Sequence, residues 1–293
     1  MTDRSVDSQH SFAIITPSYK PDFERCRLLC HSIERFVQPP IRHYIAVEQR
    51  DFQLFSSLNG PNTEVIVVQD LLPRWIFRVP KFKKAWVSLK TLPVRNWIMQ
   101  QITKIALARS VKEDVLLFLD SDEAFIRPFD CKSLIKDGLV RFYSQPDGNP
   151  ANMETPHQLW HESASQLLGL PPKPMPAPDY IADVVIWKQD NVRAMCQQIE
   201  QVTGQWWLEA LCRTWNFSEY TLYGTYIDRV LKERSGHYSD PVQILNSYYA
   251  PASLSENELQ QFLAATRPEH VAIMISAKAH MSVERYEVLI NKL

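Results

Sequence analysis

Two aspartates separated by one serine, Asp120 and Asp122, stand directly after an apolar run at residues 115–119. An apolar run that ends in acids is typical of a buried parallel strand, which carries those acids to the carboxyl edge of its sheet. Open α/β sheets bind ligands at that edge. Two neighbouring carboxylates can hold a hard divalent cation, directly or through water, and the cation would neutralise a diphosphate. The pattern therefore indicates nucleotide diphosphate chemistry, although the same residues also suit an acidic turn.

The residues before Asp120 alternate between strand and helix patterns. Short apolar runs predict buried strands at residues 12–15, 44–47 and 65–68. Spaced apolar residues predict helices at 21–36 and 86–109, and Pro93 should kink or split the second of these. Strand, helix and strand in this order favour an α/β fold with a mostly parallel sheet and right-handed crossovers.

The second half of the chain has a different pattern, with a proline-rich connector at 170–178 that cannot be helical. The remaining patterns predict strands at 139–143, 180–187 and 271–276, and helices at 189–202, 205–214 and 219–233. We expect a polar N-terminal tail at 1–11, followed by one continuous domain with two halves, 12–145 and 146–293.

The composition limits the class of protein. With 293 residues, of which 45% are hydrophobic, the chain can bury a large core. Its net charge of -1 gives no general attraction to nucleic acid, so we expect no nucleic-acid partner. The 5 cysteines form no Cys-x-x-Cys pair, which favours a reducing, cytoplasmic location without structural zinc. No apolar stretch approaches the ~18 residues of a membrane span, and there is no glycine-rich phosphate loop.

Four segments together carry a resemblance to a known family. They are Thr16-Pro17-Ser18-Tyr19 after the first strand, Gln100-Gln101-x-x-Lys104, Leu117-Phe118-Leu119-Asp120-Ser121-Asp122, and Ser218-Glu219-Tyr220-x-Leu222-Tyr223-Gly224. Over about residues 12–282 the chain resembles a GT-A-type glycosyltransferase, and more narrowly a bacterial group that carries the second and fourth segments. The resemblance implies a GT-A (Rossmann-like) fold, in which 12–145 binds a nucleotide sugar and the helical half 146–293 binds the acceptor.

The resemblance also implies how the donor is held. In GT-A enzymes the loop after the first strand and an acid after a neighbouring strand hold the nucleoside, which makes Thr16, Pro17, Tyr19 and Asp70 candidates. Tyr19 could stack on the base. Gln100 and Lys104 lie four residues apart on one predicted helix face, so they could reach the ribose or the phosphates together, or could form a solvated face.

The same resemblance implies a metal site for Mn²⁺ or Mg²⁺, ions that suit carboxylate, diphosphate and water ligands. Asp122 would bind the metal directly, whereas Asp120, beside Ser121, would contact the ribose or a water on the metal. A histidine from the C-terminal region often completes such a site, and His280 after the last apolar run resembles that ligand. His237 is the second candidate.

Transfer by inversion requires a base opposite the leaving diphosphate. Glu219, at the start of a predicted helix, is the first candidate, although an acid beside a Ser218 cap also suits a helix N-terminus. Asp183, inside the predicted strand 180–187, is the second, because a buried acid is costly unless it is paired or used. Asp183 could instead bind an acceptor hydroxyl.

The expected partners are a nucleotide-sugar donor, in particular a UDP-sugar, and a glycan or other hydroxyl acceptor. A basic and aromatic segment at 74–84 could also contact an anionic membrane surface, or could be solvated charge over a packed loop.

Two other functions remain open. The aspartate motif also resembles the first motif of haloacid-dehalogenase-type phosphatases, in which the first acid is a nucleophile. In that family the motif opens the domain, whereas here three strand and helix units precede Asp120. A non-catalytic module of GT-A type would bind nucleotide without turnover. Release of phosphate from simple phosphoesters would support a phosphatase, and release of UDP from a UDP-sugar would support a transferase.

Overall fold

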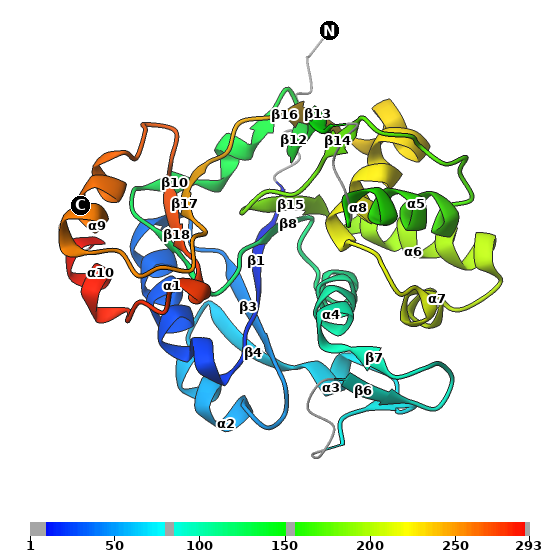
Figure 1. The fold of residues 1–293 in the computed structure, drawn as a ribbon, viewed down its shortest axis with the longest axis horizontal. Coiled ribbons are helices and arrows are strands. Elements are labelled where there is room, and N and C mark those ends of the chain that lie inside the picture. The colour runs from blue at the N-terminus through cyan, green and yellow to red at the C-terminus, as the bar shows by residue number, and fades with distance from the viewer. Residues whose placement is uncertain (1–9, 80–84, 151–155, 291–293) are drawn as a thin grey trace, which may run out of the picture.

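The computed structural model describes residues 10–79, 85–150 and 156–290. Within these ranges the central sheet has five strands in the order β15-β8-β1-β3-β4 (Figure 1). The strands are β15 (Val185–Lys188), β8 (Val115–Phe118), β1 (Phe12–Pro17), β3 (Arg42–Val47) and β4 (Thr63–Val67). All neighbours in this sheet are parallel except β15, which runs antiparallel to β8. The mixed α/β architecture with a mostly parallel sheet is therefore confirmed.

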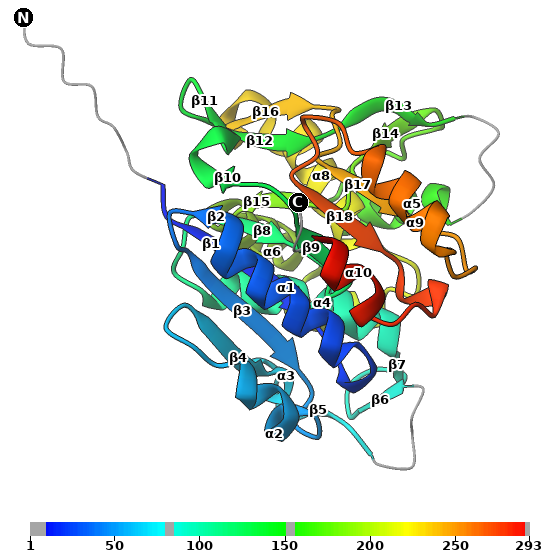
Figure 2. The same ribbon diagram turned by 90° about the vertical axis from the view of Figure 1, so that its left-hand side faces the viewer.

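Helices cover both faces of the central sheet, and its strands are therefore buried on both sides. Leu116 and Phe118 of β8 pack into a core with α4 and α6, whereas Val115 and Leu117 pack on the opposite face with α1. Figure 2 shows α1 in front of the central strands and α4 behind them. The α-helices of the described residues are α1 (Phe23–Phe36), α2 (Phe52–Phe55), α3 (Val68–Leu71), α4 (Asn96–Ser110), α5 (His157–Leu167), α6 (Gln189–Thr203), α7 (Trp207–Arg213), α8 (Glu219–Thr225), α9 (Glu256–Ala264) and α10 (Glu284–Ile290).

Smaller sheets surround the central one in the described part of the chain. Their members are β5 (Ile76–Phe77), β6 (Ala85–Ser88) and β7 (Val94–Arg95); β17 (Leu245–Tyr248), β18 (Ala272–Ile275) and β9 (Glu123–Phe125); β11 (Ile135–Lys136), β12 (Leu139–Tyr143) and β16 (His237–Asp240); β13 (Gln145–Asn149) and β14 (Ala177–Asp179); β10 (Phe129–Asp130) and β2 (Val37–Gln38). Several pairings join the halves of the chain, since β15 completes the central sheet, β18 pairs with β9 and β16 pairs with β12.

Most expected strands and helices are present, but the helix expected at 86–109 is wrong in its first third. Residues there form β6 and β7, and α4 begins only at Asn96. Pro93 explains the difference, since proline lacks an N–H and disfavours a helical conformation in the residue before it. The chain therefore forms β6, a turn at 89–92 and β7 before the helix begins.

Two elements of the second half also differ from expectation. The strand expected at 180–187 begins only at Val185, so Asp183 lies in irregular chain before it. The helix expected at 219–233 is regular only in α8, after which it continues as a π-helical segment at Tyr226–Leu231 and a short 3-10 turn.

No helix in the described ranges combines the length and the apolar character that crossing a bilayer would require.

Candidate functional site

A cavity of about 510 Å³ lies at the carboxyl edge of the central sheet. Residues at or just after the ends of three neighbouring parallel strands line it: Pro17, Ser18 and Tyr19 at β1, Glu48 and Arg50 at β3, and Asp120, Ser121 and Asp122 at β8. The first turns of α4 and the small sheet β5-β6-β7 supply further walls, including Trp97, Gln100, Arg78 and Trp86. The sheet edge that the sequence predicted to bind a ligand therefore contains a cavity.

The register of the strands explains why these residues converge. Ile15 of β1 pairs with Phe118 of β8, and the backbone N–H of Leu119 donates to Ile15 at 3.1 Å. On the other side of β1, the backbone N–H of Ser18 donates to Ala46 of β3 at 2.9 Å. Parallel strands in register end at the same edge, so the loops after them face one another.

Asp122 is anchored to the C-terminal part of the chain. The backbone N–H of Ala277 donates to its Oδ2 at 2.9 Å. Burial raises the pKa of Asp122 to about 6, and repulsion from Asp120 and Asp22 adds to this increase, whereas the Ala277 hydrogen bond opposes it. Burial also raises the pKa of Asp22, which lines the same cavity. Because these acids oppose one another's ionisation, a cation between them would be stabilised.

Asp120 has a different environment, since its side chain is 53% exposed and contacts a buried cation. Lys104 Nζ lies 3.4 Å from Asp120 Oδ1 and 3.2 Å from Glu219 Oε1, and it donates to the Tyr220 hydroxyl at 2.6 Å. Burial alone would lower the pKa of Lys104, but Asp120, Tyr220 and Glu219 raise it, so the ammonium stays charged. We call Lys104, Asp120, Glu219 and Tyr220 the lysine cluster.

Glu219 lies at the first position of α8, as the sequence indicated, but it does not line the cavity. Ser218 caps this helix, because its hydroxyl accepts from the backbone N–H of Thr221 at 3.3 Å. The backbone N–H of Glu219 donates to Gln101 Oε1 at 2.9 Å, and burial raises the pKa of its carboxyl against the opposing effect of Lys104. Glu219 is therefore enclosed and ion-paired.

Asp183, the second base candidate, lies at the same sheet edge as Asp120, although it too is not among the described residues that line the cavity. Val185 pairs with Phe118, and the two strands are antiparallel. Asp183, two residues before Val185, therefore lies at the level of Asp120, two residues after Phe118. Asp183 is half-buried and accepts hydrogen bonds from the hydroxyls of Ser247 and Tyr249. Its carboxylate is therefore held in one orientation near the acids of β8.

The structure separates the expected nucleoside-binding residues into two groups. Pro17, Tyr19, Gln100 and Ser121 line the cavity, and Tyr19 is 47% exposed there. In contrast, Thr16 is buried, with its Oγ1 3.0 Å from His43 Nε2, and Asp70 is exposed on α3 away from the cavity lining.

Glu48 was missed, although the signal that identified Asp120 was present in the sequence. It directly follows the apolar run of β3 and lines the cavity. Arg78 donates to it twice, from Nη2 at 2.7 Å and from Nε at 3.0 Å, and Arg50 Nη2 lies 3.2 Å from it. The two arginines bring positive charge to the cavity, and no local sequence pattern marks Arg78 as a neighbour of Glu48.

The expected metal ligands are only partly assembled. His280 is exposed in the turn that begins at Ala277, the residue bonded to Asp122, and has a left-handed backbone with φ of 51°. Within the described ranges there is no group of three or more His, Cys, Asp or Glu arranged to hold an ion. His237 is half-buried, and both of its ring nitrogens are engaged, with Nε2 at 2.8 Å from the Tyr223 hydroxyl and Nδ1 at 3.0 Å from the Val140 carbonyl.

The basic and aromatic segment at 74–84 lies partly outside the described residues, which exclude 80–84. In its described part, Arg78 contacts Glu48 at the cavity, and Trp75 packs edge-on against Trp206 with ring centroids 6.3 Å apart.

The chain belongs to the family described as "Family of unknown function (DUF6492)", whose model matches residues 11–288. None of the curated proteins matches the sequence. The matched range contains every residue that lines the cavity. Since the family description gives no function, the geometry of this cavity is the basis for inferring one.

Proposed function

We propose that this protein is a metal-dependent glycosyltransferase of GT-A type, which transfers a sugar from a nucleotide diphosphate donor, in particular a UDP-sugar, to a glycan or other hydroxyl acceptor. The observation that carries the proposal is the cavity of about 510 Å³, which the loop after β1 and the Asp120-Ser121-Asp122 turn after β8 line together. A cavity of this size can hold a nucleotide-sized ligand, and its place at the carboxyl ends of parallel strands is where such folds bind ligands.

The side chains present fit a divalent cation such as Mn²⁺ or Mg²⁺. Asp122 and Asp120 would hold it, since both line the cavity and the pKa of Asp122 is raised by burial and by neighbouring acids. When bound, the ion would neutralise the charge that develops on the leaving diphosphate. Lys104 orients Asp120 by their 3.4 Å contact, and the Ala277 N–H fixes one oxygen of Asp122.

The other cavity residues suit the nucleotide. The exposed ring of Tyr19 could stack on the base, and Glu48 offers a carboxylate to base or ribose. Arg50, with a side chain that is 58% exposed, could pair with phosphate, and Gln100 projects from α4 into the same space.

For the base that accepts the proton of the acceptor hydroxyl, the geometry favours Asp183 over Glu219. Asp183 is half-buried at the sheet edge, and its orientation is held by Ser247 and Tyr249. Glu219 is enclosed, and its charge is balanced by Lys104 at 3.2 Å. We infer that Asp183 removes the proton, whereas Glu219 positions Lys104.

The proposed activity can be tested on the unmodified chain. Thermal-shift measurements with UDP-sugars should show a rise in melting temperature that requires Mn²⁺, because a ligand that binds only the native state stabilises it. UDP release from the same sugar should then be measurable. Equal melting temperatures with Mn²⁺ and with EDTA for every nucleotide sugar, and no UDP release, would contradict the proposal.

The assignment of the base has its own test. Asp183→Asn should lower the initial transfer rate by ~10²-fold or more while donor affinity changes little. Glu219→Gln should chiefly lower the melting temperature, with turnover per folded molecule nearly unchanged. The reverse result would make Glu219 the base, and normal rates in both variants would indicate a retaining mechanism or another base.

A phosphatase remains the second candidate, because Lys104 lies 3.4 Å from Asp120 and a nucleophilic aspartate of the haloacid-dehalogenase type would need a nearby cation. Phosphate release from p-nitrophenyl phosphate that disappears in Asp120→Asn would support it over the transferase.

A further inference from the structure

The turn between β6 and β7 presents two leucines to solvent. Leu89 is 74% exposed and Leu92 is 76% exposed, the highest values for large apolar side chains among the described residues. Single exposed leucines are ordinary, but two on one projecting turn form an apolar tip. In Figure 1 this turn projects from the edge of the molecule beside α7.

Hydrogen bonds fix the conformation of this turn, so the leucines do not fold back onto the protein. The hydroxyl of Ser88 accepts from the backbone N–H groups of Lys90 at 3.1 Å and Thr91 at 2.9 Å. The backbone N–H of Leu89 donates to the Trp75 carbonyl at 2.9 Å, which ties the tip to the neighbouring strand. A preorganised apolar tip loses little conformational entropy when it binds.

Aromatic rings continue the tip toward α7. Trp75 packs edge-on against Trp206, which is exposed, and Lys90 Nζ lies 5.5 Å from the centre of the Trp75 ring. Indole rings beside lysines are typical of the headgroup level of a membrane, where an apolar body meets a polar edge.

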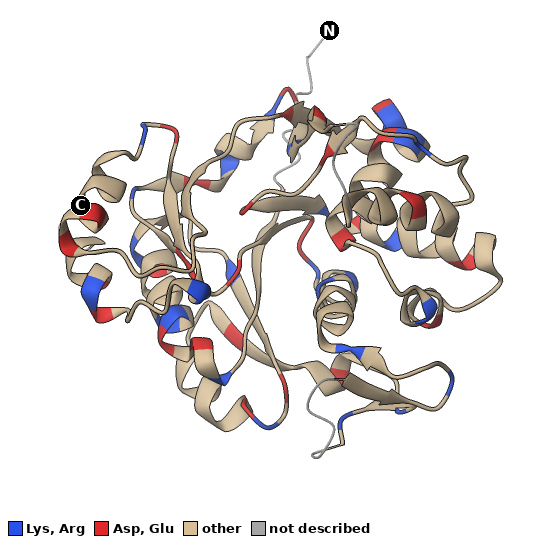
Figure 3. Cartoon of the chain, viewed as in Figure 1, with Lys and Arg blue, Asp and Glu red and all other residues tan. Residues whose placement is uncertain are grey.

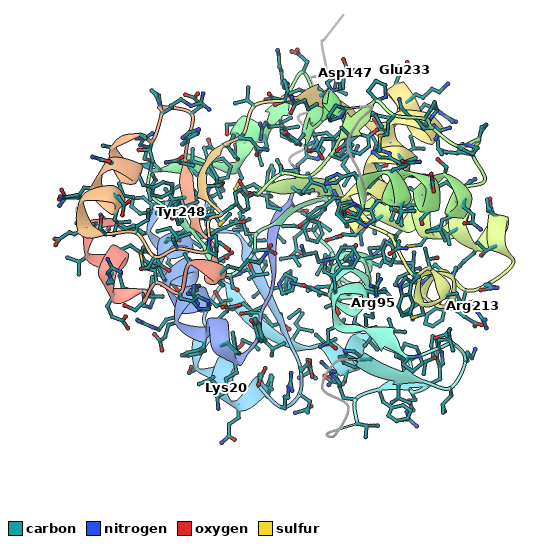
Figure 4. The ribbon with its side chains drawn as sticks, viewed as in Figure 1. Lys20, Arg95, Asp147, Arg213, Glu233 and Tyr248 are labelled. Atoms are coloured by element: carbon teal, nitrogen blue, oxygen red, sulfur yellow. The ribbon has the colours of Figure 1, made fainter. Side chains whose placement is uncertain are left out.

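The charges around the tip are mainly positive. Arg74, Lys90 and Arg213 surround it, and Glu209 is an acid among them, 3.5 Å from Lys90 and 2.9 Å from Arg213. Figure 3 shows the positive colour on the turn, and Figure 4 labels Arg213 on α7 beside it. Two further arginines lie next to Trp206.

These arginines, Arg109 and Arg193, line a shallow pocket of about 280 Å³ together with Trp206 and Trp207, and no acid is among the described residues that line it. Within the described residues neither arginine forms an ion pair with a carboxylate, and the buried N–H groups of Arg109 Nε and Trp207 Nε1 have no acceptor. A cation in the last turn of α4 is also favoured by the helix dipole, so Arg109 alone would indicate nothing. Arg193 Nη2 donates to the Arg109 carbonyl at 3.3 Å, whereas the N–H of Arg109 Nε has no acceptor. An unpaired guanidinium N–H beside a second guanidinium group does indicate an anion.

We propose that this surface, defined by Leu89, Leu92, Trp206, Arg109 and Arg193 and called here the hairpin face, binds a bilayer that contains anionic phospholipids. The leucines enter the acyl boundary, the indoles lie at headgroup level, and the arginine pocket receives a lipid phosphate. Trp86, three residues before Leu89 on β6, lines the large cavity. Because a strand rises about 3.3 Å per residue, binding would place the cavity wall roughly 10 Å from the lipid.

Vesicle flotation with the full chain tests the inference. The protein should float with vesicles of phosphatidylcholine and phosphatidylglycerol but not with phosphatidylcholine alone. Leu89→Ser with Leu92→Ser should weaken binding by on the order of tenfold or more, because two apolar side chains lose their burial. Arg109→Gln with Arg193→Gln should weaken it by about fivefold for each charge removed.

The matched control is Val242→Ser with Val288→Ser, which removes two exposed apolar side chains elsewhere, 43% and 56% exposed, and should leave flotation unchanged. The leucine variant should keep the melting temperature of the parent chain, since both side chains are exposed. Absence of flotation with anionic vesicles, or equal flotation of the leucine variant and the parent, would overturn the inference. So would calorimetric binding of free glycerol phosphate without vesicle binding, or a dimer in sedimentation that the leucine variant dissociates.

Discussion

Asp120 and Glu219 contact the same ammonium group, that of Lys104. The side chain of Asp120 is 53% exposed and lines the cavity, whereas that of Glu219 is 6% exposed and is not among the described residues that line it. Both are carboxylates that follow sequence patterns typical of a functional acid. The comparison teaches that solvent access separates the acid able to meet a ligand from the acid that stabilises the fold around it.

The largest expected effect comes from removing the shared cation. Lys104→Met should lower the free energy of unfolding by about 3–5 kcal/mol, because it leaves Glu219 buried without its partner. Urea denaturation measures this loss. Lys90→Met removes an exposed lysine that pairs with Glu209 at 3.5 Å, so it should cost only about 0–1 kcal/mol. Similar losses in both variants would mean that the lysine cluster has no special role in stability.

The next largest effect concerns the acids that line the cavity and their role in metal-dependent UDP binding. Asp122→Ala should weaken UDP binding in Mn²⁺ by on the order of 100-fold, since the loss of even an outer-shell partner of a metal costs 10–100-fold. In EDTA, the variant and the parent should bind UDP equally, as measured by calorimetry. Asp147→Ala, which removes an exposed aspartate of β13, is the control and should behave as the parent. Equal Mn²⁺-dependent affinity in Asp122→Ala and the parent would refute the metal site.

A half-buried histidine with both ring nitrogens engaged extends the comparison to pH. Burial lowers the pKa of His237 from 6.5 to about 3. Between pH 6.5 and 3 the unfolded chain therefore binds a proton at His237 that the native state does not bind. The stabilisation that comes from the neutral imidazole is present above pH 6.5 and is lost as pH falls toward 3. At pH 5 the loss should be about 2 kcal/mol. His237→Gln should flatten the dependence of unfolding free energy on pH between 6.5 and 5, whereas His31→Gln, an exposed change, should not. Parallel pH curves for parent and His237→Gln would contradict this assignment.

The smallest effect is expected at His280, which is exposed in the turn that contacts Asp122. If it joins the two aspartates on the metal, His280→Ala should weaken Mn²⁺ binding by about tenfold with little change in melting temperature. Titration of Mn²⁺ in the presence of UDP measures this. Unchanged affinity would leave Asp120, Asp122, diphosphate and water as the ligand set.

The strands of the central sheet and the acids at its edge could be predicted because each depends on a short stretch of chain. The apolar run before Asp120 forms β8, and the same signal before Glu48 would have added that residue to the site. The start of α8 at Glu219, after its Ser218 cap, was predicted for the same local reason. The prediction from periodicity was wrong at 86–95, where Pro93 disfavours a helix and the chain forms the β6-β7 hairpin instead.

The surroundings of these residues could not be predicted, because they depend on segments far apart in the chain. Lys104 meets Tyr220 across 116 positions, and Asp183 meets Tyr249 across 66. The amino-acid sequence by itself determined which residues form buried strands and which acids follow them, since hydrophobic pattern and turn chemistry act locally. Only the tertiary structure decided that Asp120 lines a cavity while Glu219 is enclosed, because solvent access is a property of how distant segments pack.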